Sequence, residues 1–435
     1  MLLLAFMPAV HAFCGTYVGQ AGAELLNGAS QIAVVRQGHH TTLTLANAYQ
    51  GDATEFALVV PVPQVLGPDD VTVADPELFG RLDAYSAPRL VRYTCDDFAR
   101  SEDDLDADGG DTGAAMEEGP PADESVTVEA SFAAGEYDIA ILSADESGAL
   151  VTWLDANGYA VSANAETLLG EYIEGGSYFF AARVALDRLP EGASYLSPLQ
   201  FGYDSEVFSL PVRLGTLNSP GEQDLVLYVV NDFDSGRVGI SNYPEVAVEN
   251  ECMFDGTATF ADFYQERFTT ALTSQPRPGW VSEYQWGNGH CDPCTGEPPS
   301  DEDLTGLGYA GLEESGDTGG GGYYFFTRLH MRYGPVGVDQ DLVLYPSNDP
   351  TQAQIRYIQY DAALEDRFPR CVAGWSDDPG SCDDVDGDDE RDDTNDDARG
   401  GEERVRGGCG CGTPLSPAIG LSVVATMLVR RRRRS

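Results

Sequence analysis

Residues 31–49, QIAVVRQGHHTTLTLANAY, contain the pattern that most clearly indicates the type of fold. Residues 32–35 are an unbroken apolar run, Gly38 follows, and threonine and leucine then alternate. Two such runs separated by a glycine-containing turn are typical of a β-hairpin. We therefore expect a hairpin here. His39 and His40 should be solvated residues of its turn, which we favour over a metal-binding role.

A second apolar stretch, residues 56–68 (FALVVPVPQVLGP), indicates a different kind of strand. Its first five residues are apolar without interruption, which suits a strand buried on both faces. Pro61 and Pro63 follow. Because proline cannot donate a ladder hydrogen bond, we expect this strand to become an edge or to leave the sheet there.

The later chain mixes strand-like and helix-like patterns. Strands are expected at EYDIAILSA (136–144), SYFFAARVAL (177–186), DLVLYVV (224–230) and YYFFTRLHMRY (323–333). His330 lies in the last of these, with no histidine or carboxylate nearby in sequence, so we expect a core or edge histidine.

Three helices are also expected. Ser143 and Glu146 have the spacing of a capping box before an apolar helical pattern that ends at Asn157. A second helix should cover residues 165–173, and a third residues 260–272, where aromatic side chains recur at helical spacing. The fold class expected is therefore α+β, dominated by mostly antiparallel sheets with a few helices.

The charge balance narrows the range of functions. The chain has 435 residues, with 72 acidic and 25 basic side chains and a net charge of −47, and every basic residue is arginine. A P-loop and a Schiff-base site both need lysine, so both are excluded. The negative charge repels phosphate backbones, so nucleic acid is not an expected partner.

Two segments are acidic and poor in large apolar residues, and they should not form a core. Residues 101–125 are an insert that holds the start of a calcium-loop pattern at Asp104, Asp106, Asp108 and Asp111. The glutamate expected at loop position twelve is Ala115, so a solvated loop is favoured over a calcium site. Residues 376–408 are expected to form an extended, self-repelling stalk.

Both ends of the chain resemble targeting segments. Residues 1–12 are apolar and end in a small-x-small pattern, which predicts a signal peptide cleaved between Ala12 and Phe13. Residues 409–435 contain Cys409 and Cys411, a short apolar segment, and a basic cluster that fits the positive-inside rule: Arg430, Arg431, Arg432, Arg433 and Arg434. This tail resembles the MYXO-CTERM sorting signal of myxobacterial surface proteins. The resemblance implies processing near one of the two cysteines and display on the cell surface.

Seven further cysteines lie between these ends. In an exported chain they are candidates for disulfides: Cys14, Cys95, Cys252, Cys291, Cys294, Cys371 and Cys382. His290 beside Cys291-x-x-Cys294 could also form a redox pair or half of a zinc site. The prolines around this loop favour a structural disulfide over either, so no cofactor is expected, and calcium and zinc are minor alternatives. We found no G-x-S-x-G and no H-E-x-x-H motif, and no catalytic residue is identified.

The body of the chain resembles a bacterial exported family, the domain of unknown function 2330. The stretches that carry this resemblance are FCGTYVGQAGAELLNGASQIAVVRQG, FALVVPVP, YLSPLQFGYDSEVFSLPVRLGTLNS, CDPC and TRLHMRY. The family implies export and brings no activity or site residue with it. The expected parts are a signal peptide (1–12), a β-rich N-terminal part (13–100), the acidic insert (101–125), the α+β remainder (126–375), the stalk (376–408) and the sorting signal (409–435).

The function expected from these features is a non-enzymatic role at the cell envelope: adhesion, envelope structure, or binding of an extracellular partner. The chain would meet the export and sorting machinery, and the membrane through its C-terminal segment. Two alternatives remain open. One is a secreted metal-dependent or redox enzyme centred on the His290–Cys294 loop, and the other is a weak calcium-responsive surface module.

Overall fold

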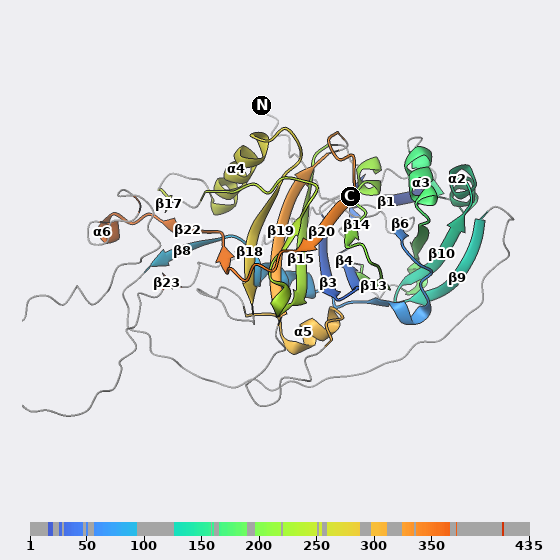
Figure 1. Ribbon diagram of the computed structural model, residues 1–435, viewed down its shortest axis with the longest axis horizontal. Helices are drawn as coiled ribbons and strands as arrows, with labels where there is room; N and C mark the ends of the chain where they lie inside the picture. The colour runs from blue at the N-terminus through green and yellow to red at the C-terminus, as the bar shows by residue number, and fades with distance from the viewer. Residues whose placement is uncertain are drawn as a thin grey trace, which may run out of the picture.

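The computed structural model of the protein describes the greater part of its folded body (Figure 1). The described residues are 16–20, 26–27, 30–46, 49–50, 56–93, 126–157, 159–160, 165–188, 196–218, 221–249, 252–254, 259–287, 297–310, 324–334, 336–365, 371 and 411–412. The fold is dominated by β-strands in mostly antiparallel sheets, as the sequence predicts.

Two large sheets form the centre of the molecule. The first, in order, contains β21 (Ala353–Gln354), β18 (Trp280–Gly287), β19 (Tyr324–Tyr333), β15 (Gln223–Asp232), β3 (Ser30–Gln37), β4 (His40–Leu45), β13 (Leu199–Asp204) and β7 (Val71–Val73). The second contains β11 (Tyr159–Ala160), β1 (Thr16–Gln20), β6 (Phe56–Val62), β12 (Tyr178–Val184), β10 (Tyr137–Ala144) and β9 (Val126–Ala134).

Three small sheets lie around them. Their strands are β14 (Ser209–Leu210), β20 (Leu342–Pro346) and β16 (Val238–Ile240); β17 (Cys252–Met253), β22 (Arg356–Gln359), β8 (Arg89–Tyr93) and β23 (Cys411–Gly412); and β2 (Leu26–Asn27) with β5 (Tyr49–Gln50). The described helices are α1 (Leu78–Ser86), α2 (Ser147–Ala156), α3 (Ala165–Glu174), α4 (Phe260–Thr273), α5 (Asp301–Gly306) and α6 (Ala362–Glu365).

The two large sheets pack face to face over one shared core. Ile32 of β3 and Leu227 of β15 belong to the same buried cluster as Leu58 of β6, Ile139 of β10 and Phe180 of β12. Helices α2 and α3 cover the other face of the second sheet, and α1 and α5 cover part of the other face of the first. The result is a layered body in which strands are buried on both faces, with helices on the outside (Figure 1).

This double burial explains the hairpin of residues 31–49. The predicted hairpin is confirmed as β3 and β4, joined at Gly38. Alternate residues of β3 enter different cores: Ile32 faces the second sheet, and Ala33 faces α1. An unbroken apolar run is therefore needed, because a polar side chain on either face would be buried.

The proline-bearing strand β6 lies inside its sheet between β1 and β12. Of the two predicted outcomes, that the strand leaves the sheet at Pro61 is wrong, because its ladder to β12 continues past Pro61 to Val62. On the other side, the described ladder to β1 reaches Val59, opposite Thr16, where the described part of β1 begins. The other outcome, that β6 becomes an edge, stays a prediction.

The helix predictions are confirmed for α3 and α4, and α2 ends at the predicted Asn157. The predicted capping box of α2 is wrong. Ser143 remains in β10 and its hydroxyl donates to Glu129 of β9, while Glu146 is an N-cap without a side-chain bond. The sheet keeps Ser143 extended, because the register of β10 with β9 continues to Ala144.

Two glycines with positive φ provide a matched test of this packing. A Cβ on Gly236 (φ +62°) would lie 2.4 Å from the carbonyl oxygen of Asp349, whereas a Cβ on Gly38 (φ +57°) would meet no atom within 4 Å. We predict that Gly38→Ala lowers the free energy of unfolding by about 1 kcal/mol, the cost of the backbone conformation alone. Gly236→Ala should cost about 3 kcal/mol or more, since backbone must also move. Urea denaturation measures both, and equal losses would contradict the packing described.

Candidate functional site

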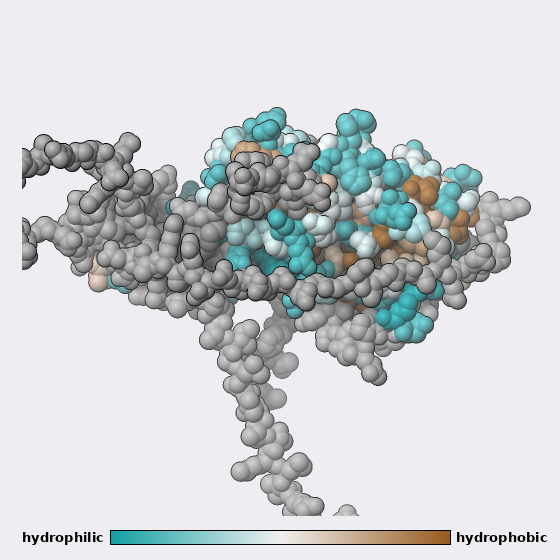
Figure 2. Space-filling model, turned by 90° about the horizontal axis from the view of Figure 1, so that it is seen from below, coloured by the Kyte–Doolittle hydropathy of each residue, from teal (hydrophilic) through white to brown (hydrophobic). Residues whose placement is uncertain are grey.

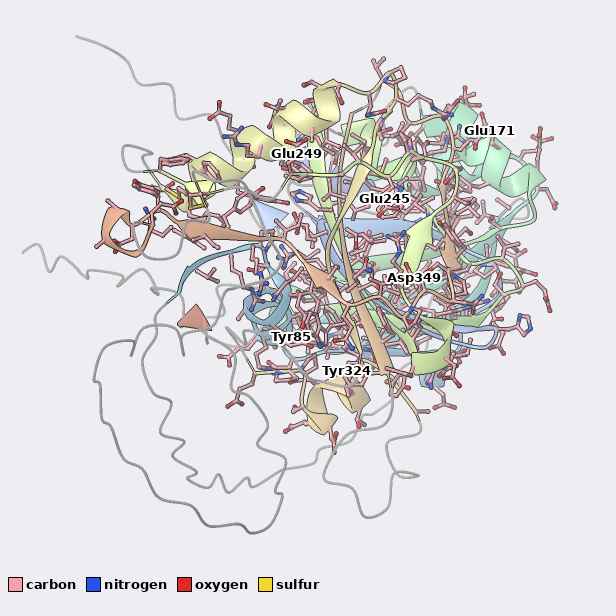
Figure 3. All side chains as sticks on the ribbon, turned by 60° about the vertical axis from the view of Figure 1, so that its left-hand side comes forward. Tyr85, Glu171, Glu245, Glu249, Tyr324 and Asp349 are labelled. Atoms are coloured by element: carbon pink, nitrogen blue, oxygen red, sulfur yellow. A yellow bond between two sulfur atoms is a disulfide. The ribbon has the colours of Figure 1, made fainter. Side chains whose placement is uncertain are left out.

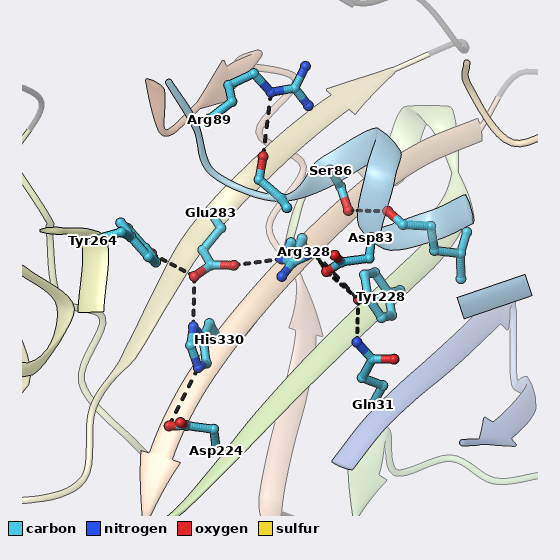
Figure 4. A network of polar contacts seen from close by, with 12 residues as sticks. Gln31, Asp83, Ser86, Arg89, Asp224, Tyr228, Tyr264, Glu283, Arg328 and His330 are labelled. Carbon is cyan, nitrogen blue, oxygen red and sulfur yellow. Dashed lines mark hydrogen bonds and ion pairs between the residues drawn. The ribbon is translucent and has the colours of Figure 1, made fainter. Parts of the chain in front are cut away.

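A buried network of charged residues lies on the outer face of the first sheet, between α1 and α4 (Figure 4). We call it the charge network. Its acidic members are Asp83, Asp224 and Glu283; its basic members are Arg328, His330 and Arg332; its tyrosines are Tyr228 and Tyr264. These residues come from α1, β15, α4, β18 and β19, which are far apart in sequence.

Glu283 is the centre of the network, and its side chain is 0% exposed. The register of β18 with β19 shifts between Ser282 and Tyr284, so Glu283 is the extra residue of a β-bulge. On the other side of the strand, its backbone carbonyl accepts from the amide of Ile355, next to the pairing of β18 with β21. Its side chain lies on the face that carries Arg328 and His330.

Three donors satisfy the Glu283 carboxylate. Oε1 accepts from the Tyr264 hydroxyl at 2.6 Å and lies 2.7 Å from Nδ1 of His330, and Oε2 accepts from Nε of Arg328 at 2.6 Å. Burial by itself would raise the pKa of this carboxyl. His330 and Arg328 outweigh burial, and the pKa falls to about 2. Glu283 is therefore ionised at any ordinary pH.

His330 is held between two carboxylates. Nδ1 faces Glu283, and Nε2 lies 3.5 Å from Oδ1 of Asp224. Phe268 of α4 covers the imidazole, with the ring centroids 3.9 Å apart. Burial would lower the pKa of His330, but Glu283 and Asp224 outweigh it and raise the pKa to about 9. The imidazole is thus protonated near neutral pH.

The network extends on both sides of this pair. Arg328 also donates to Asp83 of α1 at 2.7 Å, and the Tyr228 hydroxyl donates to the same Asp83 oxygen. Arg332 binds Asp224 through two nitrogens, at 2.7 and 2.8 Å. Burial would raise the pKa of Asp224, but its bonds with His330 and Arg332 lower it to about 2.

This arrangement suits a structural role better than proton transfer. A general acid or base works best with a pKa near the working pH. Here the pKa values of Glu283 and Asp224 are moved down and that of His330 is moved up, each away from neutrality. Complete burial of Glu283 also denies a solute access to the centre. The network joins α1 and α4 to the central strands.

The sequence analysis placed His330 correctly in a strand and expected a core or edge histidine. It is a core histidine of β19, and its two carboxylate neighbours are 47 and 106 residues away in sequence. No local signal could reveal them, although three basic residues at every second position, Arg328, His330 and Arg332, do mark one face of the strand.

His39 and His40 are exposed at the β3–β4 turn, as predicted. Nδ1 of His40 lies 2.9 Å from Asp204, and Nδ1 of His39 lies 3.5 Å from Glu206. Within the described part of the chain, no group of three or more histidine, cysteine, aspartate or glutamate side chains is placed to hold a metal ion.

Two of the seven cysteines predicted to form disulfides do so. Cys252 of β17 is bonded to Cys371, 119 residues later. The other candidate positions lie outside the described residues: Cys14, Cys95, Cys291, Cys294 and Cys382, with His290 and the calcium candidates Asp104, Asp106, Asp108 and Asp111.

The predicted targeting positions also lie outside the described residues, except for the backbone of Cys411, which with Gly412 forms β23 beside β8. They are Ala12, Phe13, Cys409 and Arg430 to Arg434. Among the helices that the structure describes, none is both long and apolar enough to cross a bilayer.

These features define a class: a layered, β-dominated protein with a disulfide and a charge network centred on a fully buried carboxylate. The family model described as "Uncharacterized protein conserved in bacteria (DUF2330)" matches residues 8–345, and the chain belongs to this family. The match confirms the resemblance found in the sequence, and it includes the whole charge network. No curated protein sequence and no solved structure matches the chain.

Removing one member of the network should be costly. We predict that Arg328→Met lowers the free energy of unfolding by about 3–5 kcal/mol, because it leaves the buried Glu283 carboxylate short of a partner. The matched control is Arg277→Met, which breaks an exposed ion pair with Asp339 of similar length, 2.8 Å. It should cost less than about 1 kcal/mol. Similar losses in the two variants, measured by urea denaturation, would contradict the structural role.

The raised pKa of His330 predicts a pH dependence on the alkaline side. The pKa of a histidine in an unfolded chain is about 6.5, whereas the pKa of His330 in the folded protein is about 9. The folded state therefore binds this proton more tightly. Its contribution is complete below pH about 6.5, is on the order of 3 kcal/mol, and is lost as the pH rises through about 9.

The matched variant is His330→Gln, which cannot take up a proton. Unfolding free energies measured between pH 6 and 10 should decline steeply for the original protein and much less for the variant. Parallel curves would show that His330 does not carry the dependence.

Proposed function

We propose that this protein is exported, is displayed at the cell envelope, and acts by binding an extracellular partner and not by catalysis. The observation that carries the proposal is the Cys252–Cys371 disulfide. Disulfides form and persist in oxidising compartments and are rare in the reducing cytosol. The bond therefore supports the export that residues 1–12 and the C-terminal tail predict.

The position of the disulfide supports display on a stalk. Cys371 is the last described residue of the folded body before the acidic segment 376–408. The bond ties this exit point to Cys252 of β17, beside Val91 of β8 and Ile358 of β22 in one small core. A pull on the stalk would thus reach a small sheet of the body directly through a covalent bond.

The charge network supports a binding role over a catalytic one. Its carboxylates and its imidazole are already paired with one another. Because these groups neutralise one another inside the body, contact with other molecules is left to the side chains on its surface. Adhesion and envelope structure are both forms of such binding.

The predicted sorting signal gives the test of display. We predict that changing both Cys409 and Cys411 to Ser leaves the protein uncleaved or releases it from the cells. Surface display is measured by protease treatment of intact cells and by immunoblots of cells and medium. The matched control changes Cys252 and Cys371 to Ser, which weakens the body by about 3–5 kcal/mol and keeps the tail. Normal display of the tail variant would refute the sorting role of these cysteines.

A further inference from the structure

β9 is a long edge strand. It spans 9 residues and, among the described residues, is paired only with β10. The other edges of the two large sheets are much shorter: β11 and β21 have 2 residues each and β7 has 3. Edge strands present unpaired backbone groups, and proteins commonly protect them with short length, proline, charged side chains or bulges. β9 is long and contains no lysine or proline, and its one charge, Glu129, lies at its one register shift.

Apolar side chains of β9 are left half-covered. The register with β10 shifts at Glu129, so the two halves of the strand face opposite cores. Val128 packs against the cluster beneath α2, while Ala130 and Phe132 pack against the core between the sheets, and all three are only half-buried. An added strand with apolar side chains at every second position would therefore extend the core between the sheets beside Ala130 and Phe132.

The surface near the outer edge of β9 carries further apolar side chains. Half-buried Val151 and Trp153 of α2 belong to the same cluster as Val128. In Figure 2, brown apolar surface gathers toward the right-hand end of the molecule, where Figure 1 places β9, β10, α2 and α3. The patch is bordered by hydrophilic surface.

Carboxylates surround this edge. Glu129 is exposed in the middle of β9. Exposed Asp69 and Asp70 belong to the 3₁₀ turn η2 (Pro68–Asp70), which packs beside β9. Exposed Asp145 and Glu146 follow the end of β10 that pairs with Val126.

The nearby arginines do not neutralise the negative charge of these carboxylates. Arg183 and Arg188 lie near the other end of β9, and both bind Asp138, which is opposite Ala133. Figure 3 labels further acidic side chains of the body, among them Glu171, Glu245 and Asp349, and the net charge of the chain is −47. An incoming strand meets carboxylates along the edge and is favoured if it is basic.

We propose that the outer edge of β9 binds an extended, basic segment of another protein by strand addition, with apolar side chains at alternate positions of that segment. Backbone hydrogen bonds would supply affinity, and the half-covered residues would select the apolar positions. The carboxylates would select arginine or lysine between them. The inference deepens the proposed function and rests on it only for the extracellular location of the partner.

The test uses the purified exported protein and a synthetic peptide as long as β9 in which valine and arginine alternate. Calorimetry should show binding, and hydrogen exchange should show new protection of the β9 amides. A peptide with glutamate in place of arginine should not bind. A peptide N-methylated at every backbone nitrogen should not bind either, because it has no N–H donor left for a ladder on either of its edges. Binding of the methylated peptide, or protection elsewhere, would overturn strand addition.

Two variants distinguish binding at the edge of β9 from attraction of the peptide by the overall negative charge of the protein. Glu129→Arg should weaken binding of the arginine peptide by about fivefold or more, whereas Glu266→Arg, on the exposed side of distant α4, should leave it unchanged. Equal weakening would overturn the assignment to β9. Concentration-dependent protection of β9 without peptide would identify a second copy as the occupant and overturn the basic partner. Because the protein is purified, failure here leaves the test of surface display untouched.

Discussion

The buried carboxylate of Glu283 is the constraint on which the outer face of the first sheet depends. A charge with no exposed surface is tolerated only when its partners are complete, since breaking a buried pair leaves an uncompensated charge. Those partners are Tyr264 of α4 with Arg328 and His330 of β19, and Arg328 in turn binds Asp83 of α1. Two helices and the central strands are therefore held in one arrangement. The bulge in β18 is part of the same constraint, because it places Glu283 within reach of these groups.

Burial on both faces of the sheets accounts for the shared core and for the pairing of the buried charges. The shared core between the sheets draws on residues before and after the acidic insert, so neither part has a complete core of its own. A charged side chain that is buried against a sheet covered on both faces must be paired with an opposite charge. The charge network supplies these pairs. The acidic surface then remains for contact with other molecules. In the proposed function the disulfide fastens the body to its stalk, and the long outer edge of β9 offers the place where a partner can extend the structure.

Elements with strong local periodicity were predictable from sequence. The hairpin of β3 and β4, the strands β10, β12, β15 and β19, and the helices α3 and α4 all follow from patterns within a few residues. The capping box at Ser143 failed because pairing with β9 outweighed a local helix signal. The alternation in β9 suggests one apolar face, yet the bulge at Glu129 divides it between two cores. The candidate site was missed: His330 was read as an isolated histidine, and Glu283 carried no signal.

The sequence by itself determined the class of protein, the strand-rich body, the family, and the exclusion of lysine chemistry, because these rest on composition and on short repeating patterns. The tertiary structure alone decided that Cys252 pairs with Cys371, that Glu283 meets Arg328 and His330, and that β9 is the last of the described strands in its sheet. Each of these is a contact or an open edge set by chain segments distant in sequence. The physical reason is the same in all three. Which backbone groups are paired, and which charges are buried together, depends on sheet order and register, and local residue patterns do not encode either.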